Sequence, residues 1–270
     1  MKIYNCKFCN QPFLKKVKLY DHQKCCRKKI KELHNNIDNI EYNFQEIILS
    51  RNYIFIDPSD LYGDIYDNKS FIEIKNYHSK LYENNEKIKY WKYTDILFLL
   101  YHYDFELAKL FLKININYPA LLADIGRIVI LYYFGGVYHD LKFTSNKNLL
   151  TLLNKNKGKI KFISESFIKN NTLFIRNSNM ISMDIKLKIL DDILKIYKQN
   201  LLKNYNDKSF GSASMWNLGS KTYINYIKIS KSKDIIQNNL SKNEFINYIP
   251  FLKTYNKKTW QTTNDYLFAY

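Results

Sequence analysis

Cysteine and histidine are concentrated at the start of the chain, at a spacing that suits a metal ion. Cys6 and Cys9 are separated by two residues, and His22 and Cys26 are four positions apart, so that they share one face of a helix. Three thiolates and one imidazole can surround an ion tetrahedrally, which is the arrangement of structural zinc sites. Cys25 lies three positions after His22 and is an alternative fourth ligand. The segment is therefore predicted to bind one structural zinc ion.

Apolar residues between these ligands complete the pattern of a zinc finger. Phe13 and Leu19 would form the small core of such a module, and residues 4–26 resemble the C2H2 class in its variant with Cys as the last ligand. The resemblance implies a small N-terminal ββα zinc finger over residues 1–29. The basic residues Arg27–Lys29 could contact nucleic-acid phosphates. One finger would specify little sequence, so a structural or protein-binding role is an equal alternative.

A second set of chemically capable residues lies in the middle of the chain. Asp124 and Arg127 are three positions apart in an otherwise apolar helix predicted over 119–134, and buried charges of this kind need partners. A simple ion pair within the helix is the alternative interpretation. Gly135-Gly136 ends the helix, and Asp140 falls at the end of the strand predicted next, where open α/β sheets bind ligands. The pattern predicts a site for a diphosphate, a metal or a ribose.

The same segment resembles glycosyltransferase family 32, the glycosyltransferases with a DXD sugar-binding motif, which are related to the catalytic domains of large glucosylating toxins. The family pattern is A-x-x-(S/A)-D-x-x-R-x-x-x-L-x-x-x-G-G-x-Y-x-D-x-D. Nine positions of this chain match it: Ala120, Ala123, Asp124, Arg127, Leu131, Gly135, Gly136, Tyr138 and Asp140. The resemblance implies a GT-A fold, a Rossmann-like α/β nucleotide-sugar transferase domain. It also implies retaining transfer of a hexose from a UDP- or GDP-sugar to a glycan or protein acceptor.

The resemblance also implies roles for individual residues. Asp124 and Arg127 would contact hydroxyl groups of the donor sugar, and Tyr138 would lie near the nucleotide. Asp140 would contact the ribose and the metal shell. Trp260, preceded by Thr259, resembles the Ser-Trp of a C-terminal loop that closes over the diphosphate, with packing of the indole in the core as an equal alternative.

One position departs from the family pattern, because Lys142 replaces the second Asp of the motif. In the family that Asp binds a divalent metal, so the need for Mn²⁺ or Mg²⁺ is in question here, and activity with it. Residues two apart on a strand face the same side, so Lys142 could place its ammonium where the metal would lie and stabilise the leaving diphosphate. The candidate catalytic residues are then Asp140, Lys142 and Trp260. The alternative is a degenerate transferase fold that serves as a zinc-finger module binding nucleic acid or protein.

Strand-like and helix-like segments alternate after residue 50 and must position these side chains, which indicates an α/β domain. The helix over 119–134 begins at Pro119, which suits a first helical position. Thr94 is predicted to cap another helix. The predicted strands are 53–57, 87–91, 137–139, 159–164 and 173–176, and the predicted helices are 71–82, 94–101, 119–134 and 183–199.

The composition sets limits on the whole chain. Its 270 residues are 46% hydrophobic, which is enough for one ordinary domain with a small appendage. We expect a C2HC-type zinc finger over 1–29, a helical linker over 30–50 and a GT-A glycosyltransferase domain over 51–270. The net charge of +17 attracts polyanions, but Lys recurs along the whole chain, so only weak nucleic-acid contact through the finger and the basic surface is expected. The sequence shows neither a signal peptide nor a transmembrane run, which predicts a cytoplasmic protein, of a virus-infected cell or one with an AT-rich genome.

Overall fold

The structure is a computed structural model of the chain. It describes residues 4–5, 12–13, 51–54, 69–81, 88–115, 118–141, 143–145, 162–169, 172–182, 184–206, 218–219, 221–223, 225–226, 235–236 and 246–248. Several predicted features lie outside these residues: the zinc ligands Cys6, Cys9, His22 and Cys26, the linker helix over 30–50, Lys142 and Trp260.

A six-stranded mixed sheet forms the centre of the fold, with strand order β4-β3-β5-β8-β7-β9. The first three strands in this order are parallel, β8 is antiparallel to both β5 and β7, and β9 is parallel to β7. The strands are β3 (Arg51–Ile54), β4 (Ile88–Trp91), β5 (Gly136–Asp140), β7 (Phe162–Lys169), β8 (Thr172–Ser182) and β9 (Ile235–Ile236).

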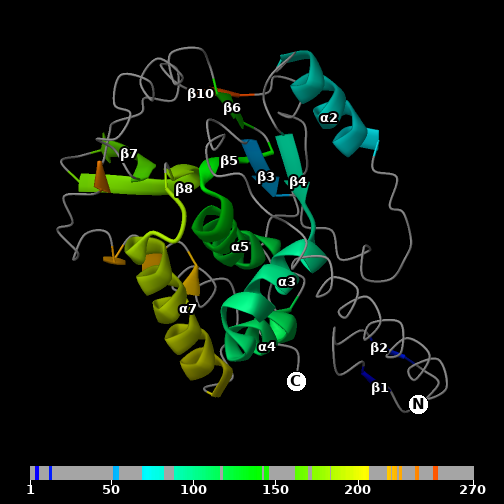
Figure 1. Ribbon diagram of the computed structural model, residues 1–270, viewed down its shortest axis with the longest axis vertical. Helices are drawn as coiled ribbons and strands as arrows, with labels where there is room; N and C mark the ends of the chain where they lie inside the picture. The colour runs from blue at the N-terminus through cyan, green and yellow to red at the C-terminus, as the bar shows by residue number, and fades with distance from the viewer. Residues whose placement is uncertain are drawn as a thin grey trace.

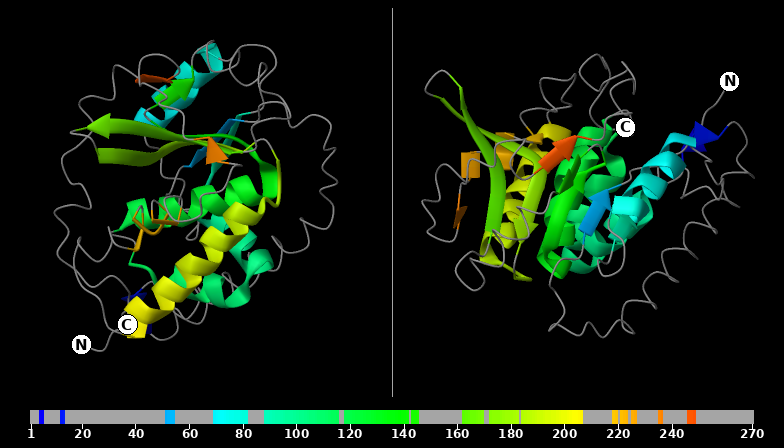
Figure 2. Two further views of the ribbon diagram at one scale, coloured as in Figure 1. Left: turned by 90° about the vertical axis from the view of Figure 1, so that its left-hand side faces the viewer. Right: turned by 90° about the horizontal axis from the view of Figure 1, so that it is seen from above.

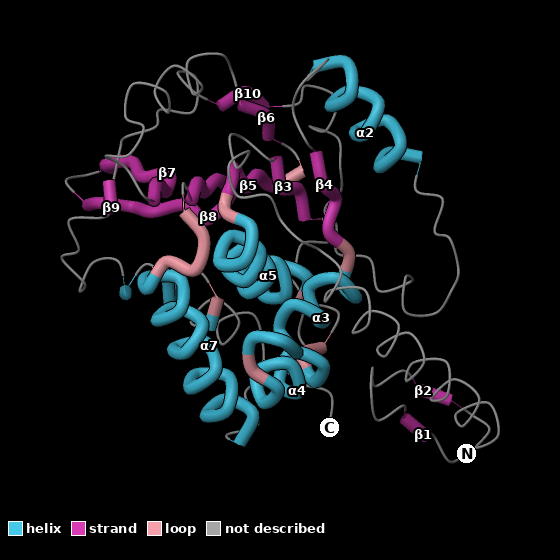
Figure 3. Tube along the Cα trace, in the orientation of Figure 1, coloured by secondary structure: helices cyan, strands magenta, loops and turns pink. Residues whose placement is uncertain are grey.

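Helices cover both faces of this sheet (Figures 1 and 2). One face carries α3 (Tyr93–Tyr103), α4 (Phe105–Lys113), α5 (Pro119–Phe134) and α7 (Lys188–Asn206). The opposite face carries α2 (Lys69–Leu81). Figure 3 shows the resulting layers, with strands between α2 and the group of four helices.

The alternation of side chains along β4 shows how the sheet joins the two layers. Trp91 packs its ring against Phe134 of α5, with ring centroids 4.9 Å apart. The preceding residue, Tyr90, points to the other face, where its hydroxyl lies 2.8 Å from Nδ1 of His78 on α2. Because successive residues of a strand face opposite sides, one edge strand contributes to both apolar layers.

Helix α5 is the central element of the larger core, and its ends follow from its sequence. Pro119 occupies the first turn, where a missing N–H costs nothing. Ten of its residues are buried, from Leu121 to Leu131, so the helix is apolar on nearly all sides. It stops at Gly135, whose φ of 58° and ψ of −152° suit glycine alone, and Gly136 follows with a φ of 88°. The two glycines turn the chain directly into β5.

Two short pairs of strands lie apart from the central sheet. Strands β1 (Tyr4–Asn5) and β2 (Pro12–Phe13) form an antiparallel pair with Tyr4 opposite Phe13. Strands β6 (Phe143–Ser145) and β10 (Ile246–Tyr248) form another antiparallel pair, with Tyr248 opposite Phe143. The second pair connects the strand that follows β5 to the last part of the chain. Among the described helices, none is long and apolar enough to cross a membrane.

Several predicted boundaries differ from the observed ones. Thr94 does not cap α3: the cap is Lys92, whose backbone N–H donates to the Asp95 carboxylate at 3.0 Å. Strand β8 runs to Ser182 rather than ending at 176, because it pairs with both β5 and β7, and α7 consequently starts at Lys188 rather than at 183. The sequence analysis missed α4 altogether.

Candidate functional site

Helix α5 and strand β5 bring Asp124, Arg127, Tyr138 and Asp140 into one network of contacts. Arg127 lies at its centre, with Nη2 at 3.1 Å from Oδ1 of Asp124 and Nη1 at 3.6 Å from Oδ1 of Asp140. The guanidinium carbon also lies 4.7 Å from the centre of the Tyr138 ring. The predicted intrahelical ion pair therefore exists, but it is one part of a network that spans two elements.

The charge of Arg127 is strongly stabilised. Its side chain is only 6% exposed, and its Nε donates to the carbonyl of Ala123 at 3.1 Å. Burial by itself lowers the pKa of Arg127, but the oxygens of Tyr138, Asp124 and Asp140 outweigh that effect and raise the pKa above its ordinary value. The guanidinium is therefore cationic at every working pH and fixed in direction.

Tyr138 and Asp140 form the other half of the network. The Tyr138 hydroxyl donates to Oδ1 of Asp140, the oxygen that also faces Arg127. Burial raises the pKa of Tyr138 well above its ordinary value, and Arg127 opposes that rise, so the phenol stays protonated and remains a donor. Among the described residues, both contacts to Asp140 are made through Oδ1. The side chain of Asp140 is 29% exposed, so this carboxylate can also meet a ligand or solvent.

The position of Asp140 in the sheet explains why it can meet a ligand. It is the last residue of β5 and lies in register with Ile54, the last residue of β3, which in turn lies beside Trp91, the last residue of β4. Three parallel strands thus end in one row. Ligands of open α/β sheets bind at this carboxyl edge.

A buried tyrosine of α7, Tyr197, was not predicted from the sequence. It is fully buried in the apolar core to which α5 and α7 both contribute, and its hydroxyl donates to the carbonyl of Gly219 at 3.0 Å. Burial raises the pKa of its phenol well above the ordinary value; Asp124 raises it further and Arg127 lowers it. The only signal in the sequence is that one tyrosine interrupts an apolar stripe of Ile and Leu.

The described residues contain no group of three or more His, Cys, Asp or Glu side chains that could hold a metal ion. The predicted zinc ligands lie outside those residues, so the zinc site remains a prediction. At the network itself, the carboxylate open to a cation is Asp140, and a guanidinium faces it at 3.6 Å. One carboxylate next to a guanidinium does not hold a divalent ion by itself. Mg²⁺ and similar ions are usually bound by one or two carboxylates together with the phosphates of the substrate.

The remaining predicted catalytic residues can be placed only by their described neighbours. Lys142 lies between Leu141 and Phe143, which both belong to the described chain. Strand β10 runs antiparallel to β6 and ends at Tyr248, opposite Phe143. Lys142 itself and the residues from 249 to Trp260 lie outside the described chain.

Comparison with known proteins locates the network within a recognised sequence region. Residues 21–159, just over half of the chain, match the profile of a family described as "Glycosyltransferase sugar-binding region containing DXD motif". The match includes α5, β5 and all four residues of the network. No curated protein matches the chain. Among solved structures, the chain is similar to one named "PaToxG Glycosyltransferase", with 12% identity and a TM-score of 0.37 over 78% of this chain and 80% of the other.

Proposed function

Because this chain belongs to the family of glycosyltransferases whose sugar-binding region contains the DXD motif, we propose that it transfers a hexose from a UDP- or GDP-sugar to a glycan or protein acceptor. The observation that carries the proposal is the contact network of Asp124, Arg127, Tyr138 and Asp140 at the carboxyl edge of the parallel strands. The proposal includes a GT-A fold, membership of glycosyltransferase family 32 and retention at the anomeric carbon.

Asp124 and Arg127 are proposed to bind the hydroxyl groups of the donor sugar. A carboxylate and a guanidinium 3.1 Å apart offer acceptors and donors in a fixed geometry, and vicinal hydroxyls can use both. The surrounding residues of α5 are buried and apolar, and hydrogen bonds to charged groups are stronger in such surroundings than in water. Asp140 is proposed to bind the ribose through its partly exposed carboxylate, and Tyr138 to orient that carboxylate next to the nucleotide.

The diphosphate is proposed to be stabilised by Lys142 rather than by a protein-bound metal. One carboxylate beside a guanidinium is a poor cation site, and the charge of Arg127 is already offset by Asp124 and Asp140, so the positive charge that faces the diphosphate is assigned to Lys142. In the proposed reaction the bond between C1 of the sugar and the diphosphate oxygen breaks. The acceptor hydroxyl oxygen bonds to C1 on the same face, and its proton passes to the departing diphosphate. A fixed ammonium would stabilise the negative charge that develops on that diphosphate.

Trp260 is proposed to belong to a segment that covers the diphosphate. The support is topological, because β10 ends opposite Phe143, one residue after Lys142. Twelve positions separate Tyr248 from Trp260, which lets an extended chain span up to about 40 Å. The C-terminal segment is thus long enough to return over the site from the place where it leaves the sheet.

The decisive experiment is donor hydrolysis by the full chain, tested against a panel of UDP- and GDP-hexoses. Asp140→Ala should abolish release of the nucleoside diphosphate while leaving the melting temperature close to that of the wild type, because this carboxylate is partly exposed. Glu73→Ala, which removes an exposed carboxylate from α2, is the matched control and should keep full turnover. Unchanged turnover in Asp140→Ala would refute the assigned site. Absence of any donor binding, together with a salt-sensitive shift of DNA in a gel, would support the alternative binding module instead.

A further inference from the structure

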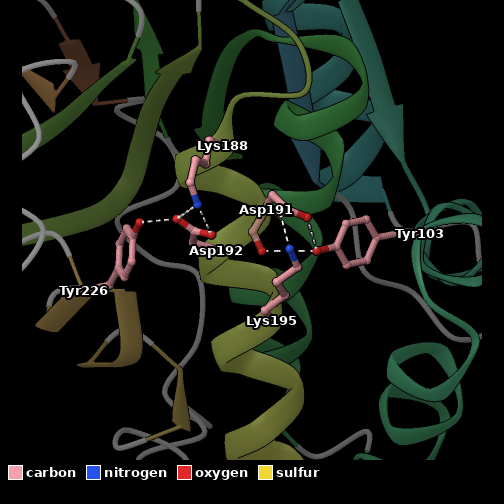
Figure 4. A network of polar contacts seen from close by, with 6 residues as sticks. All are labelled: Tyr103, Lys188, Asp191, Asp192, Lys195 and Tyr226. Carbon is pink, nitrogen blue, oxygen red and sulfur yellow. Dashed lines mark hydrogen bonds and ion pairs between the residues drawn. The ribbon is translucent and has the colours of Figure 1, made fainter.

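The side chain of Asp140 is held from the helical layer that contains α5. Arg127 of α5 faces its Oδ1 at 3.6 Å, and the Tyr138 hydroxyl donates to the same oxygen. The helices of that layer are tied to one another by polar contacts: as Figure 4 shows, the Tyr103 hydroxyl of α3 donates to Oδ1 of Asp191 on α7 at 2.7 Å. The contacts of the Asp140 carboxylate are thus made on one face of the sheet.

The backbone that follows Asp140 leaves the central sheet. Strand β8 pairs with β5 as far as His139, and β3 pairs with it as far as Asp140. The next residue, Leu141, lies in a turn, and Phe143 already belongs to the separate pair of β6 and β10. Among the described residues, the ladder of the central sheet therefore ends at Asp140 and does not fix the turn after it.

Helix α2 contacts this turn from the opposite face of the sheet. Ile74 of α2, which is 6% exposed, forms a small apolar cluster with Tyr77 and the half-buried Leu141. This cluster is separate from the larger core around α5. Two neighbouring residues of the motif are thus held from opposite sides, Asp140 by Arg127 and Leu141 by Ile74.

Helix α2 is itself attached to the sheet one turn further along. His78 lies four positions after Ile74, on the same face of the helix. Its Nδ1 is 2.8 Å from the Tyr90 hydroxyl of β4, and the two rings stack with their centroids 5.9 Å apart. Because β4 and β5 are separated by β3 in the sheet, α2 connects β4 to the turn that follows β5.

We propose that Leu141 is a positioning residue, whose packing against Ile74 fixes the turn after β5 and thereby holds the Asp140 carboxylate in the direction that binds the donor. The proposal rests on the proposed function for its readout in donor affinity. Leu141 acts through the peptide bond that joins it to Asp140, and through Ile74 it makes α2 part of the support of the site. The middle position of the motif therefore requires an apolar side chain.

The test is a double-mutant cycle of Leu141→Ala, Ile74→Ala and their combination in the full chain, titrated with UDP- and GDP-hexoses. We expect each single variant to raise the dissociation constant of the donor about fivefold. Both substitutions remove the same contact, so the double variant should bind about as weakly as the weaker single variant. Leu141→Met keeps an apolar side chain of similar volume and should stay within about twofold of the wild type. Titration calorimetry well below the lowest melting temperature measures all four.

Two controls separate this effect from a general loss of stability. Ile72→Ala makes the same substitution at a position of α2 that is 43% exposed. Tyr103→Phe removes the hydrogen bond to Asp191 from the other layer. Both variants should bind the donor within about twofold of the wild type, whatever their melting temperatures.

A second measurement does not depend on donor binding. The Tyr138 side chain is buried and its hydroxyl donates to Asp140, so the NMR signal of this proton can be assigned by its loss in Tyr138→Phe. We expect the signal to shift in Leu141→Ala and Ile74→Ala and to stay in place in Ile72→Ala.

Three results would overturn the proposal: unchanged donor affinity in the two single variants, losses that multiply in the double variant, or a Tyr138 signal that neither Leu141→Ala nor Ile74→Ala moves. If the wild type binds no nucleotide-sugar, the proposed function fails, and the Tyr138 signal alone decides whether Leu141 positions Asp140.

Discussion

At the scale of single residues, the charge balance of the network explains its arrangement. The side chains of Asp124 and Arg127 are mostly buried, each with 6% of its surface exposed, and a guanidinium paired with one carboxylate would satisfy its charge but not all of its donors. The Tyr138 ring and Asp140 complete its surroundings from the strand. Two carboxylates facing one guanidinium leave a formal charge of −1 in the network. The positive charge that a nucleotide diphosphate requires must therefore come from elsewhere, and Lys142 is the nearest candidate in the sequence.

A residue far from this network makes stability depend on pH. His78 is buried against Tyr90, and burial lowers the pKa of its imidazole from 6.5 to about 4. Between these two values the unfolded chain binds a proton at this position and the folded chain does not, so stability falls as the pH drops from 6.5 to 4. We expect the free energy of unfolding to lose at most about 3 kcal/mol across this range because of His78.

Chemical denaturation at several pH values tests that expectation. Other acidic groups titrate in the same range, so the relevant quantity is the difference between the wild type and His78→Gln, which lacks the titrating ring. That difference should change with pH between 6.5 and 4 and be constant above 7. A constant difference over the whole range would show that His78 is protonated as readily in the folded as in the unfolded chain.

At the scale of elements, α3 and α5 approach closely at Gly126. A Cβ atom added at Gly126 would lie 2.7 Å from Cδ1 of Ile96 and 3.3 Å from its Cγ atoms. Gly126 lies between Asp124 and Arg127 in the sequence, so any displacement of α5 at this point moves the pair. The absence of a side chain here is thus part of what positions the site.

Gly126→Ala is expected to destabilise the fold by about 1 kcal/mol, because overpacking against Ile96 exceeds the gain in helix propensity. Ile96→Val removes the Cδ1 atom and should by itself cost about 1 kcal/mol. In the double variant the two changes should compensate, so that its melting temperature is no lower than that of Gly126→Ala alone. Melting temperatures of all three variants decide this, and purely additive losses would contradict the proposed contact.

The sequence predicted the elements that carry the site well, and the reason is local. Helix α5 agrees with its predicted bounds because Pro119 and Gly135 mark both ends chemically. The lengths of α5 and β5 also bring Arg127 and Asp140 to the same level. Arg127 lies eight residues before Gly135 in a helix, which rises about 1.5 Å per residue. Asp140 lies five residues after Gly135 in a strand, which rises about 3.3 Å per residue. The two distances, about 12 and 16 Å, are similar. A helix and a strand that fold back at the glycines must therefore bring the two residues close together.

Features that depend on distant contacts could not be predicted in the same way. The length of β8 is set by its two neighbours in the sheet, and nothing in its own sequence marks Ser182 as its end. Tyr197 is one buried residue among several on α7, and its hydrogen bond to the distant Gly219 is what distinguishes it. Helix α4 follows α3 after a single residue, Asp104. The carboxylate of Asp104 accepts a hydrogen bond from the N–H of Leu107 at 2.9 Å and so caps the start of α4. An Asp at this position is the feature of the sequence that could have predicted this helix.

At the scale of the whole molecule, the N-terminal segment is predicted to be a separate zinc module. We expect one zinc ion per chain, bound by Cys6, Cys9, His22 and Cys26, in protein purified without chelator. A chelator should expose residues 1–29 to proteolysis, since a module this small lacks a sufficient core of its own, and should leave donor binding unchanged. Elemental analysis combined with limited proteolysis tests this, with Cys25→Ser as a control that should retain the ion. Zinc-free protein would refute the predicted finger.

The most consequential prediction for the whole molecule concerns Lys142, since it decides how a chain of net charge +17 holds a diphosphate. An ammonium near a diphosphate in a site shielded from water interacts far more strongly than the same pair in water. We therefore expect the wild type to bind UDP- or GDP-sugars equally well with EDTA and with Mn²⁺.

Lys142→Asp restores the family motif and places a second carboxylate two residues after Asp140, which is the last residue of β5. This variant should bind the donor weakly in EDTA, because two carboxylates then face the diphosphate, and Mn²⁺ should recover at least tenfold in affinity. Lys142→Met, which removes the charge without adding a ligand, is the matched control and should be weak with or without the ion. Calorimetric titrations of the three proteins under both conditions distinguish the roles, and strict dependence of the wild type on Mn²⁺ would show that Asp140 holds a metal and that Lys142 does not replace it.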